Sequence, residues 1–199
     1  ISPGPVGRFR VNCYVQRSDA AMVLRLIPDK IPTLDDLQFP ARLKEVALEK
    51  RGLVFFAGVT GSGKSTSLAA MIACCKEHTH GHIVTIEDPT EFAHSHENCP
   101  VSQREVGVDT DSWEGELKST LRQAPELILI GKIRDCATIE NAIAFARAGH
   151  LAIGHATCQQ CQSGAGPNHQ LFPPRAARAI VGGLVAQPGG HRLAAAGAP

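Results

Sequence analysis

The residues with the clearest chemical meaning lie in one glycine-rich stretch, GVTGSGKST, at positions 58–66. Its spacing is that of a phosphate-binding loop, G-x-x-x-x-G-K-[ST]. Glycines let successive backbone N–H groups turn toward one anion, and a helix beginning near Lys64 adds its positive N-terminal end. We expect Lys64 to reach the β- and γ-phosphates of ATP, and the Ser65 hydroxyl to bind the accompanying Mg²⁺. The predicted nucleotide-binding residues are Gly58, Thr60, Gly61, Ser62, Gly63, Lys64, Ser65 and Thr66.

A second group with chemical potential is acidic and comprises Glu87, Asp88 and Glu91. It follows the apolar run HIVTI at 82–86, which predicts a buried strand. Ligands of open α/β sheets bind outside the carboxyl ends of the strands, so these carboxylates are candidates for work on Mg²⁺ or on water. The alternative is a solvated strand end, because acidic residues are common there.

Strand and helix patterns alternate around these two groups. Apolar runs at 53–57, 127–130 and 150–157 predict buried strands, and helical spacing of apolar residues follows the phosphate loop, Asp111 and Asp135. Asp111 with Glu114 three residues later resembles a helix cap, and Gly149 is expected to close the last helix. Alternating strands and helices predict an α/β fold with a mostly parallel sheet covered on both faces.

The two ends of the chain differ from the middle in residue pattern and composition. Residues 8–15 alternate apolar and polar side chains, which predicts a half-buried strand, and 22–27 resembles its partner. Residues 28–40 contain three prolines and no sustained period, so we interpret them as a linker between a small domain (1–27) and the nucleotide domain (41–157). Residues 158–199 are rich in turn formers, alanine and glycine, and are expected to form a poorly ordered tail.

Composition restricts the class of protein. The chain has 199 residues, is 43% hydrophobic and carries a formal charge of +1, so its global charge favours no nucleic-acid partner. It contains no apolar run long enough for a transmembrane segment, and its N-terminus lacks the apolar core of a signal peptide. Seven cysteines beside a nucleotide site indicate reduced thiols, with Cys74 and Cys75 in the core. We therefore expect a cytoplasmic protein, and the missing initial Met suggests a fragment of a longer chain.

Several motifs in a fixed order resemble one family, the secretion and type IV pilus motor ATPases, and most closely its PilT/PilU retraction branch. The resemblance covers roughly residues 6–157. The motifs that carry it are RFRVN, GVTGSGKSTSLAAMI, TIEDPTEF, SQREVGVDTDSWEGELKSTLRQAPELILIG and RAGHLAIGHAT.

This resemblance implies a hexameric, ATP-driven motor at the cytoplasmic side of the inner membrane. It implies a RecA-like P-loop ATPase domain preceded by the end of a small PAS-like α+β domain, with related motor subunits and an inner-membrane pilus platform protein as partners. Residues 58–65 match the Walker A loop, and 86–92 match the Asp box with Glu87 as the water-activating base. Further roles implied by the resemblance are catalytic for Glu91, Arg134 and the His-box residue His155, metal-binding for Ser65 and Asp88, and nucleotide-binding for Arg104, while Arg8, Arg10 and Arg25 would present arginines to a nucleotide.

The sequence departs from the family pattern in two places. The Walker B stretch of the family reads Gly-Glu-x-Arg-Asp, whereas this chain has Lys132 in place of the glutamate within 131–135. After the His box, the helix-forming stretch of the family is replaced by residues 158–169. Three interpretations therefore stay open: a motor subunit that hydrolyses ATP, a hydrolysis-poor accessory or regulatory subunit, and a degenerate relic.

Two metal hypotheses accompany these interpretations. His155, Cys158, Cys161 and His169 have a spacing that four zinc ligands could share, although a divergent His box followed by a loop explains it better. The remaining histidines of interest are most simply solvated loop residues, with metal binding as the less favoured alternative; they are His78, His80, His82, His94 and His96.

Overall fold

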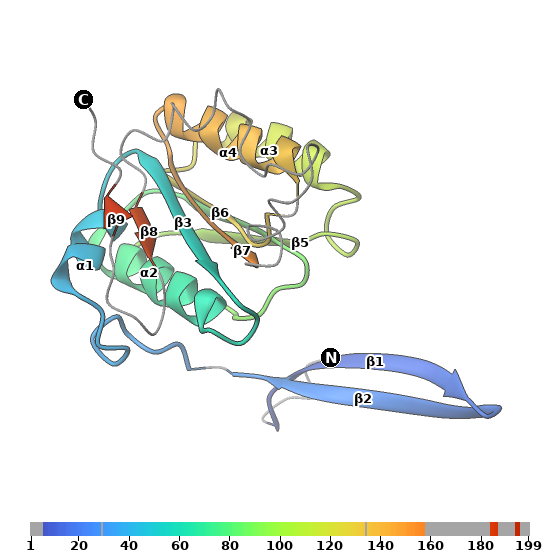
Figure 1. Ribbon diagram of the computed structural model, residues 1–199. Helices are drawn as coiled ribbons and strands as arrows, with labels where there is room; N and C mark the ends of the chain where they lie inside the picture. The colour runs from blue at the N-terminus through green and yellow to red at the C-terminus, as the bar shows by residue number, and fades with distance from the viewer. Residues whose placement is uncertain (1–5, 29, 134, 158–183, 187–193, 196–199) are drawn as a thin grey trace, which may run out of the picture.

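A mixed sheet with the strand order β5-β4-β6-β7-β3-β8-β9 forms the centre of the computed structural model (Figure 1). The structure describes residues 6–28, 30–133, 135–157, 184–186 and 194–195. Strands β5 to β8 in this order pair in parallel, and β9 pairs antiparallel with β8. The predicted α/β fold with a mostly parallel sheet is thus confirmed. The strands are β3 (Gly52–Gly58), β4 (Ile83–Glu87), β5 (Val101–Glu105), β6 (Leu127–Ile130), β7 (Leu151–Thr157), β8 (Leu184–Ala186) and β9 (Ala194–Ala195).

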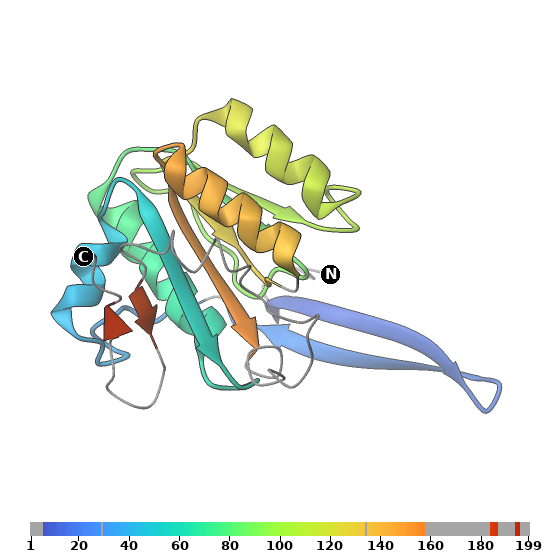
Figure 2. The same ribbon diagram turned by 45° about the horizontal axis from the view of Figure 1, so that its top comes forward.

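Helices cover both faces of this sheet, as Figure 2 shows. On one face lie α1 (Ala41–Ala47) and α2 (Lys64–His78), and on the other α3 (Trp113–Thr120), with the 3₁₀ turn η2 (Leu121–Gln123) after it, and α4 (Cys136–Arg147). No helix in the described ranges is long and apolar enough to cross a membrane. Because the central strands are buried on both faces, they are mostly apolar rather than alternating, and their polar residues include Thr85, Glu87 and His155.

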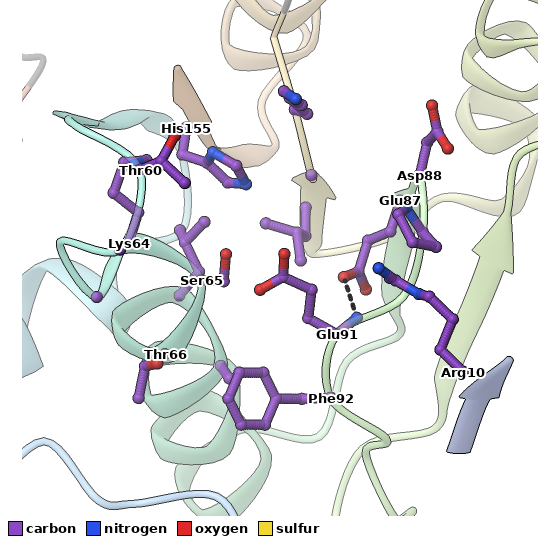
Figure 3. A pocket seen from close by; sticks show the side chains of 18 of the residues that line it. Arg10, Thr60, Lys64, Ser65, Thr66, Glu87, Asp88, Glu91, Phe92 and His155 are labelled. Carbon is purple, nitrogen blue, oxygen red and sulfur yellow. Dashed lines mark hydrogen bonds between the residues drawn. The ribbon is translucent and has the colours of Figure 1, made fainter. Parts of the chain in front are cut away.

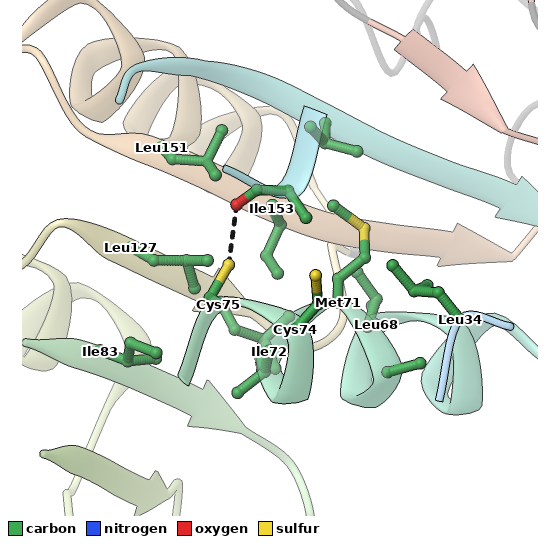
Figure 4. Packing of buried hydrophobic residues seen from close by; sticks show 14 of the residues in the cluster. Leu34, Leu68, Met71, Ile72, Cys74, Cys75, Ile83, Leu127, Leu151 and Ile153 are labelled. Atoms are coloured by element: carbon green, nitrogen blue, oxygen red, sulfur yellow. Dashed lines mark hydrogen bonds between the residues drawn. The ribbon is translucent and has the colours of Figure 1, made fainter. Parts of the chain in front are cut away.

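Two hydrophobic clusters result, one on each face. Residue Phe56 of β3 faces α2, whereas its neighbour Phe55 faces the cluster that includes α4. Figure 4 shows Met71 and Ile72 of α2 packed toward Ile153 of β7. The two predicted core thiols are confirmed: Cys74 and Cys75 are buried, and the Cys75 thiol donates to the carbonyl oxygen of Ala47 at 2.8 Å. Burial of the Cys75 thiol raises its pKa to about 12, so it is inert at neutral pH.

The N-terminal segment forms an antiparallel hairpin of β1 (Arg8–Gln16) and β2 (Asp19–Ile27). The strand pairing agrees with the prediction, but the predicted half-buried face is wrong. Val15, Met22 and Leu26 are more than half exposed, because the hairpin extends away from the sheet domain and no layer of described residues covers its outer part. Whether it belongs to a PAS-like domain of 1–27 stays a prediction.

Other details of the fold differ from the sequence analysis. Strand β5 was not predicted, because its sequence VSQRE has one apolar residue and no period. The N-cap of α3 is Ser112, whose hydroxyl accepts from the N–H of Gly115, and not Asp111. Within the segment interpreted as a linker, Leu34 is only 3% exposed and belongs to the core. Within the predicted tail, the structure describes β8 and β9 alone.

Candidate nucleotide-binding site

The sheet register places three chemically important positions in one row. Ile86 pairs with Ile130, and Ile130 pairs with Gly154. The next residue along each parallel strand is therefore Glu87, Gly131 or His155, and these three lie side by side at the carboxyl edge of β4, β6 and β7. The amide of Gly131 donates to the carbonyl oxygen of Ile86 at 2.7 Å, which extends the pairing to the row itself. Groups far apart in sequence thus meet because the strands run parallel.

Gly131 makes room for the carboxylate beside it. A Cβ atom at this position would lie 2.9 Å from Cγ of Glu87 and 3.1 Å from its Cα. Real side chains do not approach so closely, so any other residue at 131 would displace Glu87. The glycine of the predicted Walker B stretch thus has a steric role in this chain.

The phosphate loop between β3 and α2 has the geometry that its sequence predicts. Gly61 and Gly63 adopt φ angles of +82° and +83°, in the left-handed region that favours glycine. Gly63 is the N-cap of α2 and provides no side chain, so the first N–H groups of the helix are free of side-chain capping. A phosphate group suits such an end, because the N–H groups and the helix dipole both favour an anion.

Two polar side chains of the loop suit the same ligand. Lys64 is only 6% exposed, and its ammonium group donates to the carbonyl oxygens of Gly58 and Val59 at 3.0 and 2.7 Å. The Ser62 hydroxyl is buried and has no hydrogen-bond partner among the residues that the structure describes. A buried cation beside an unpaired hydroxyl makes the loop chemically complementary to phosphate oxygens.

A cavity of about 600 Å³ opens between this loop and the acidic end of β4. Figure 3 shows the Glu91 side chain directed across it toward Ser65, with His155 close to Thr60 and Lys64. Ser65 and a carboxylate on opposite sides suit a Mg²⁺ ion, which takes few protein ligands and shares the rest with phosphates and water. Most of the predicted site residues line this cavity: Thr60, Gly61, Gly63, Lys64, Ser65, Thr66, Glu87, Asp88, Glu91 and His155.

Glu87 is a buried carboxyl group with an unusual pKa. Glu87 is 9% exposed. The Thr85 hydroxyl donates to its Oε1 at 3.0 Å, and the backbone amide of Glu91 donates to its Oε2 at 3.4 Å. Burial raises the pKa of Glu87 to about 7, although hydrogen bonds from Thr85, Glu91 and Gln103 act in the opposite direction. A carboxyl group whose pKa lies near neutrality can accept and return a proton at physiological pH.

His155 stands at the other end of the row. Burial, together with the positive charges of Lys64 and Lys132, lowers its pKa to about 4. The imidazole is therefore neutral at pH 7 and can offer one N–H and one lone pair. Its Nδ1 atom is buried without a hydrogen-bond partner among the described residues. The histidine is thus available to a ligand in the cavity.

The remaining predicted site residues are placed differently. Arg104 is not among the residues that line the cavity: it donates to the carbonyl oxygen of Asp109 at 2.9 Å and lies 3.5 Å from the Glu116 carboxylate. Asp88 lines the cavity, but its carboxylate points away from Ser65 in Figure 3. Gly58 and Ser62 lie at the base of the loop, where a Cβ on Gly58 would lie 2.7 Å from the Ser62 hydroxyl. Arg134 lies outside the described residues.

Two arginines from the hairpin also line the cavity, as the resemblance implies. Arg10 of β1 pairs directly with Arg25 of β2 in the antiparallel register, so both project from the same face. Arg8 is not among the residues that line the cavity; it pairs with Ile27 at the end of the hairpin. The cavity therefore has basic groups on two sides, from the phosphate loop and from the hairpin.

His94 is a cavity residue that the sequence analysis placed among the solvated histidines, which is wrong. Burial lowers its pKa to about 4, and its backbone N–H donates to Oε1 of Gln103 at 2.7 Å. Beyond it, the buried Lys76 of α2 binds the carbonyl oxygen of Ser95 and the Glu97 carboxylate, at 3.0 and 2.8 Å. The aromatic residue Phe92 in the same loop is the feature of the sequence that indicates that this loop packs against the rest of the protein.

Two other histidines form local hydrogen bonds. His82 shares a hydrogen bond of 2.9 Å with the Ser102 hydroxyl, and the ring of His78 lies 2.8 Å from the carbonyl oxygen of Cys74. Within the described ranges no group of three or more His, Cys, Asp or Glu side chains could hold a metal ion. Three members of the zinc hypothesis, Cys158, Cys161 and His169, lie outside those ranges.

Comparison with known sequences gives a consistent result. The family model for type II/IV secretion system proteins matches residues 6–160. The type IV pilus ATPase PilU of Pseudomonas aeruginosa is 56% identical over 153 residues, which is 77% of this chain and 40% of that protein. The retraction ATPase PilT of the same organism is 47% identical over 152 residues, 76% of this chain and 44% of that protein. The chain thus spans less than half the length of these relatives.

Solved structures agree with the sequences. A crystal structure of the pilus retraction motor PilT with bound ADP superimposes with a TM-score of 0.82 at 35% identity, over 93% of this chain and 56% of that one. The ATPase DotB of Legionella pneumophila gives a TM-score of 0.69 at 31% identity, over 76% of this chain and 44% of that one. The family match covers most of the chain, including every element that builds the cavity, and we conclude that this chain belongs to the type II/IV secretion system protein family.

Proposed function

We propose that this chain binds Mg²⁺-ATP and hydrolyses it as part of a motor subunit for type IV pilus retraction. The observation that carries this proposal is the phosphate loop, intact in sequence and geometry, which faces the buried Glu87 across one cavity. A nucleotide held by the loop would direct its terminal phosphate toward that carboxyl group. One relative named as a type IV pilus ATPase and another named for pilus retraction support the choice of biological process.

In the proposed reaction each residue has a specific role. Lys64 and the N–H groups at the start of α2 bind the phosphates and offset their charge. Glu87 accepts a proton from the attacking water, or orients it, which its near-neutral pKa permits. When bound through Ser65, Mg²⁺ supplies further positive charge to the phosphate oxygens. Arg10 and Arg25 stabilise negative charge that develops on the transferred group, as arginines do in related phosphoryl transfers.

We also propose assembly and location. A ring of six subunits, formed with copies of this chain or with related motor subunits, would act at the cytoplasmic face of the inner membrane on a pilus platform protein. The outer part of the hairpin supports this assembly, because it extends from its own domain and leaves apolar side chains such as Val15 and Met22 exposed to a neighbouring subunit.

A second candidate function is an accessory subunit that binds nucleotide but hydrolyses it poorly. The observation that favours it is Lys132, which lines the cavity and acts electrostatically on His155. A cation at this position repels Mg²⁺ and weakens the binding of the water molecules around the metal.

Two measurements distinguish the three candidate functions. Binding of labelled ATP would argue against a degenerate relic, and phosphate release would distinguish the motor subunit from the accessory subunit.

Replacing Lys64 by Ala should abolish ATP binding. Backbone N–H groups alone cannot offset the charge of the β- and γ-phosphates, and the lysine is the cation at the loop. Calorimetric titration of Mg²⁺-ATP into the parent and into Lys64→Ala measures this, with Lys50→Ala, a lysine outside the cavity, as the matched control. Equal affinity of the two lysine variants for ATP would refute the assigned site.

The proposed ring predicts a large particle in the presence of ATP. Native mass spectrometry or light scattering at high protein concentration should find six subunits, and replacing both Arg10 and Arg25 by Ala should lower ATP turnover. A strictly monomeric mass with saturating ATP would count against assembly of this chain.

Replacing Lys132 by Glu should increase steady-state phosphate release at least about tenfold, equivalent to about 1.4 kcal/mol of barrier. The substitution removes a cation and adds a carboxylate on the metal side of the site. Both proteins are compared at saturating Mg²⁺-ATP and in matched oligomeric state. Rapid turnover by the parent without any gain in the variant would mean that Lys132 is harmless.

The buried Glu87 should make stability depend on pH. Its folded pKa of about 7 lies above the ordinary value of 4.5, so its contribution to stability is fully present below pH 4.5 and is lost as pH rises through 7. The neutral variant Glu87→Gln lacks this loss, and its free energy of unfolding relative to the parent should rise by about 3 kcal/mol between pH 4.5 and pH 8. Urea unfolding of both proteins at several pH values tests this, and a pH-independent difference would contradict it.

A further inference from the structure

The loop between β4 and β5, residues 88–100, contributes five residues to the lining of the candidate nucleotide cavity: Asp88, Pro89, Glu91, Phe92 and His94. It contains no helix or strand, so regular backbone pairing does not hold it in place. Some other set of contacts must fix these side chains relative to the phosphate loop.

Two polar side chains on one face of β5 supply those contacts. The carboxamide of Gln103 accepts from the N–H of His94 at 2.7 Å and donates to the carbonyl oxygen of Phe92 at 2.9 Å. Two residues further along, and so on the same face of the strand, Glu105 accepts from the N–H of Thr90 at 3.1 Å. The strand therefore binds alternate residues of the loop, at 90, 92 and 94.

Gln103 also reaches the catalytic candidate at the start of the same loop. Its side chain lowers the pKa of the Glu87 carboxyl group, which accepts from the amide of Glu91 at 3.4 Å. One carboxamide thus holds the loop at two backbone groups and also acts electrostatically on the proposed base. Gln103 is not among the residues that line the cavity, so its influence on a bound ligand passes through the residues that it holds.

We propose that Gln103 is a positioning residue for ATP hydrolysis, which fixes the 88–100 loop and the Glu87 carboxylate in a single arrangement against the nucleotide cavity. This inference rests on the proposed ATPase function. A residue with this role affects the chemical step more than nucleotide binding, because the phosphate loop binds the nucleotide independently of β5. A residue that only stabilised the fold would affect both to the same degree.

The test compares two substitutions on neighbouring positions of β5. Gln103→Met keeps the length of the side chain and removes its hydrogen bonds to the loop. Ser102→Ala is the matched control, because Ser102 lies on the opposite face of the strand and bonds only His82 among the contacts found for it. Turnover, affinity for Mg²⁺-ADP and the thermal midpoint are measured for both, in the parent and in the Lys132→Glu background.

We expect Gln103→Met to lower kcat at least about tenfold, with affinity for Mg²⁺-ADP changed less than about threefold, and Ser102→Ala to leave both unchanged. Backbone amide exchange in residues 88–100 should be faster in Gln103→Met and unaltered in the control. Unchanged kcat in Gln103→Met would overturn the proposal, and so would a loss of kcat matched by an equal loss of affinity. Failure of the parent to bind ATP at all would instead refute the proposed function, and the Lys64→Ala titration detects that outcome separately.

Discussion

The parallel register of β4, β6, β7 and β3 is the constraint on which the whole site depends. Because these strands run in one direction, the phosphate loop, Glu87, Gly131 and His155 all emerge at one edge. A one-residue slip of β6 would move Gly131 out of the row and put a side chain against Glu87. The apolar residues that fill both faces of the sheet therefore also determine the geometry of the polar groups at its end.

The electrostatics of this edge follow from burial. Cations are present on several sides of the cavity, from Lys64, Lys132 and the hairpin arginines. Burial raises the pKa of Glu87 and lowers that of His155, so each spends a large part of its time uncharged near pH 7. Glu87 therefore cancels less of the positive charge in the cavity than an ordinary glutamate would, which favours a ligand with several negative charges. Two titratable groups with pKa values displaced in opposite directions, in one cavity, are typical of a catalytic site.

The sequence predicted the parts of this structure that have a local pattern. The glycine-rich loop has a specific spacing, and β3, β4, β6 and β7 are mostly apolar runs, so the turn between β3 and α2 and these four strands were identified correctly. Strand β5 has no such pattern: its polar side chains Gln103 and Glu105 have partners only because the 88–100 loop folds back onto them. The burial of His94 and the exposure of the hairpin depend likewise on which distant segment provides a covering layer. Periodicity reports which face of an element can be buried, and tertiary contacts decide whether it is.

Helix α2 contributes to the candidate nucleotide site at its first residue and contacts the 88–100 loop near its other end. Its first residue, Lys64, belongs to the phosphate loop. Lys76, twelve residues further along, donates hydrogen bonds to Ser95 and Glu97 of the 88–100 loop. These points are about 18 Å apart along the helix axis, and a hydrogen-bonded helix is stiff in that direction. The helix consequently keeps the distance between these two contact points constant. If the phosphate loop moved along that axis during a nucleotide cycle, α2 would move the 88–100 loop near Ser95 and Glu97 by a similar distance. The two sides of the cavity would then move together.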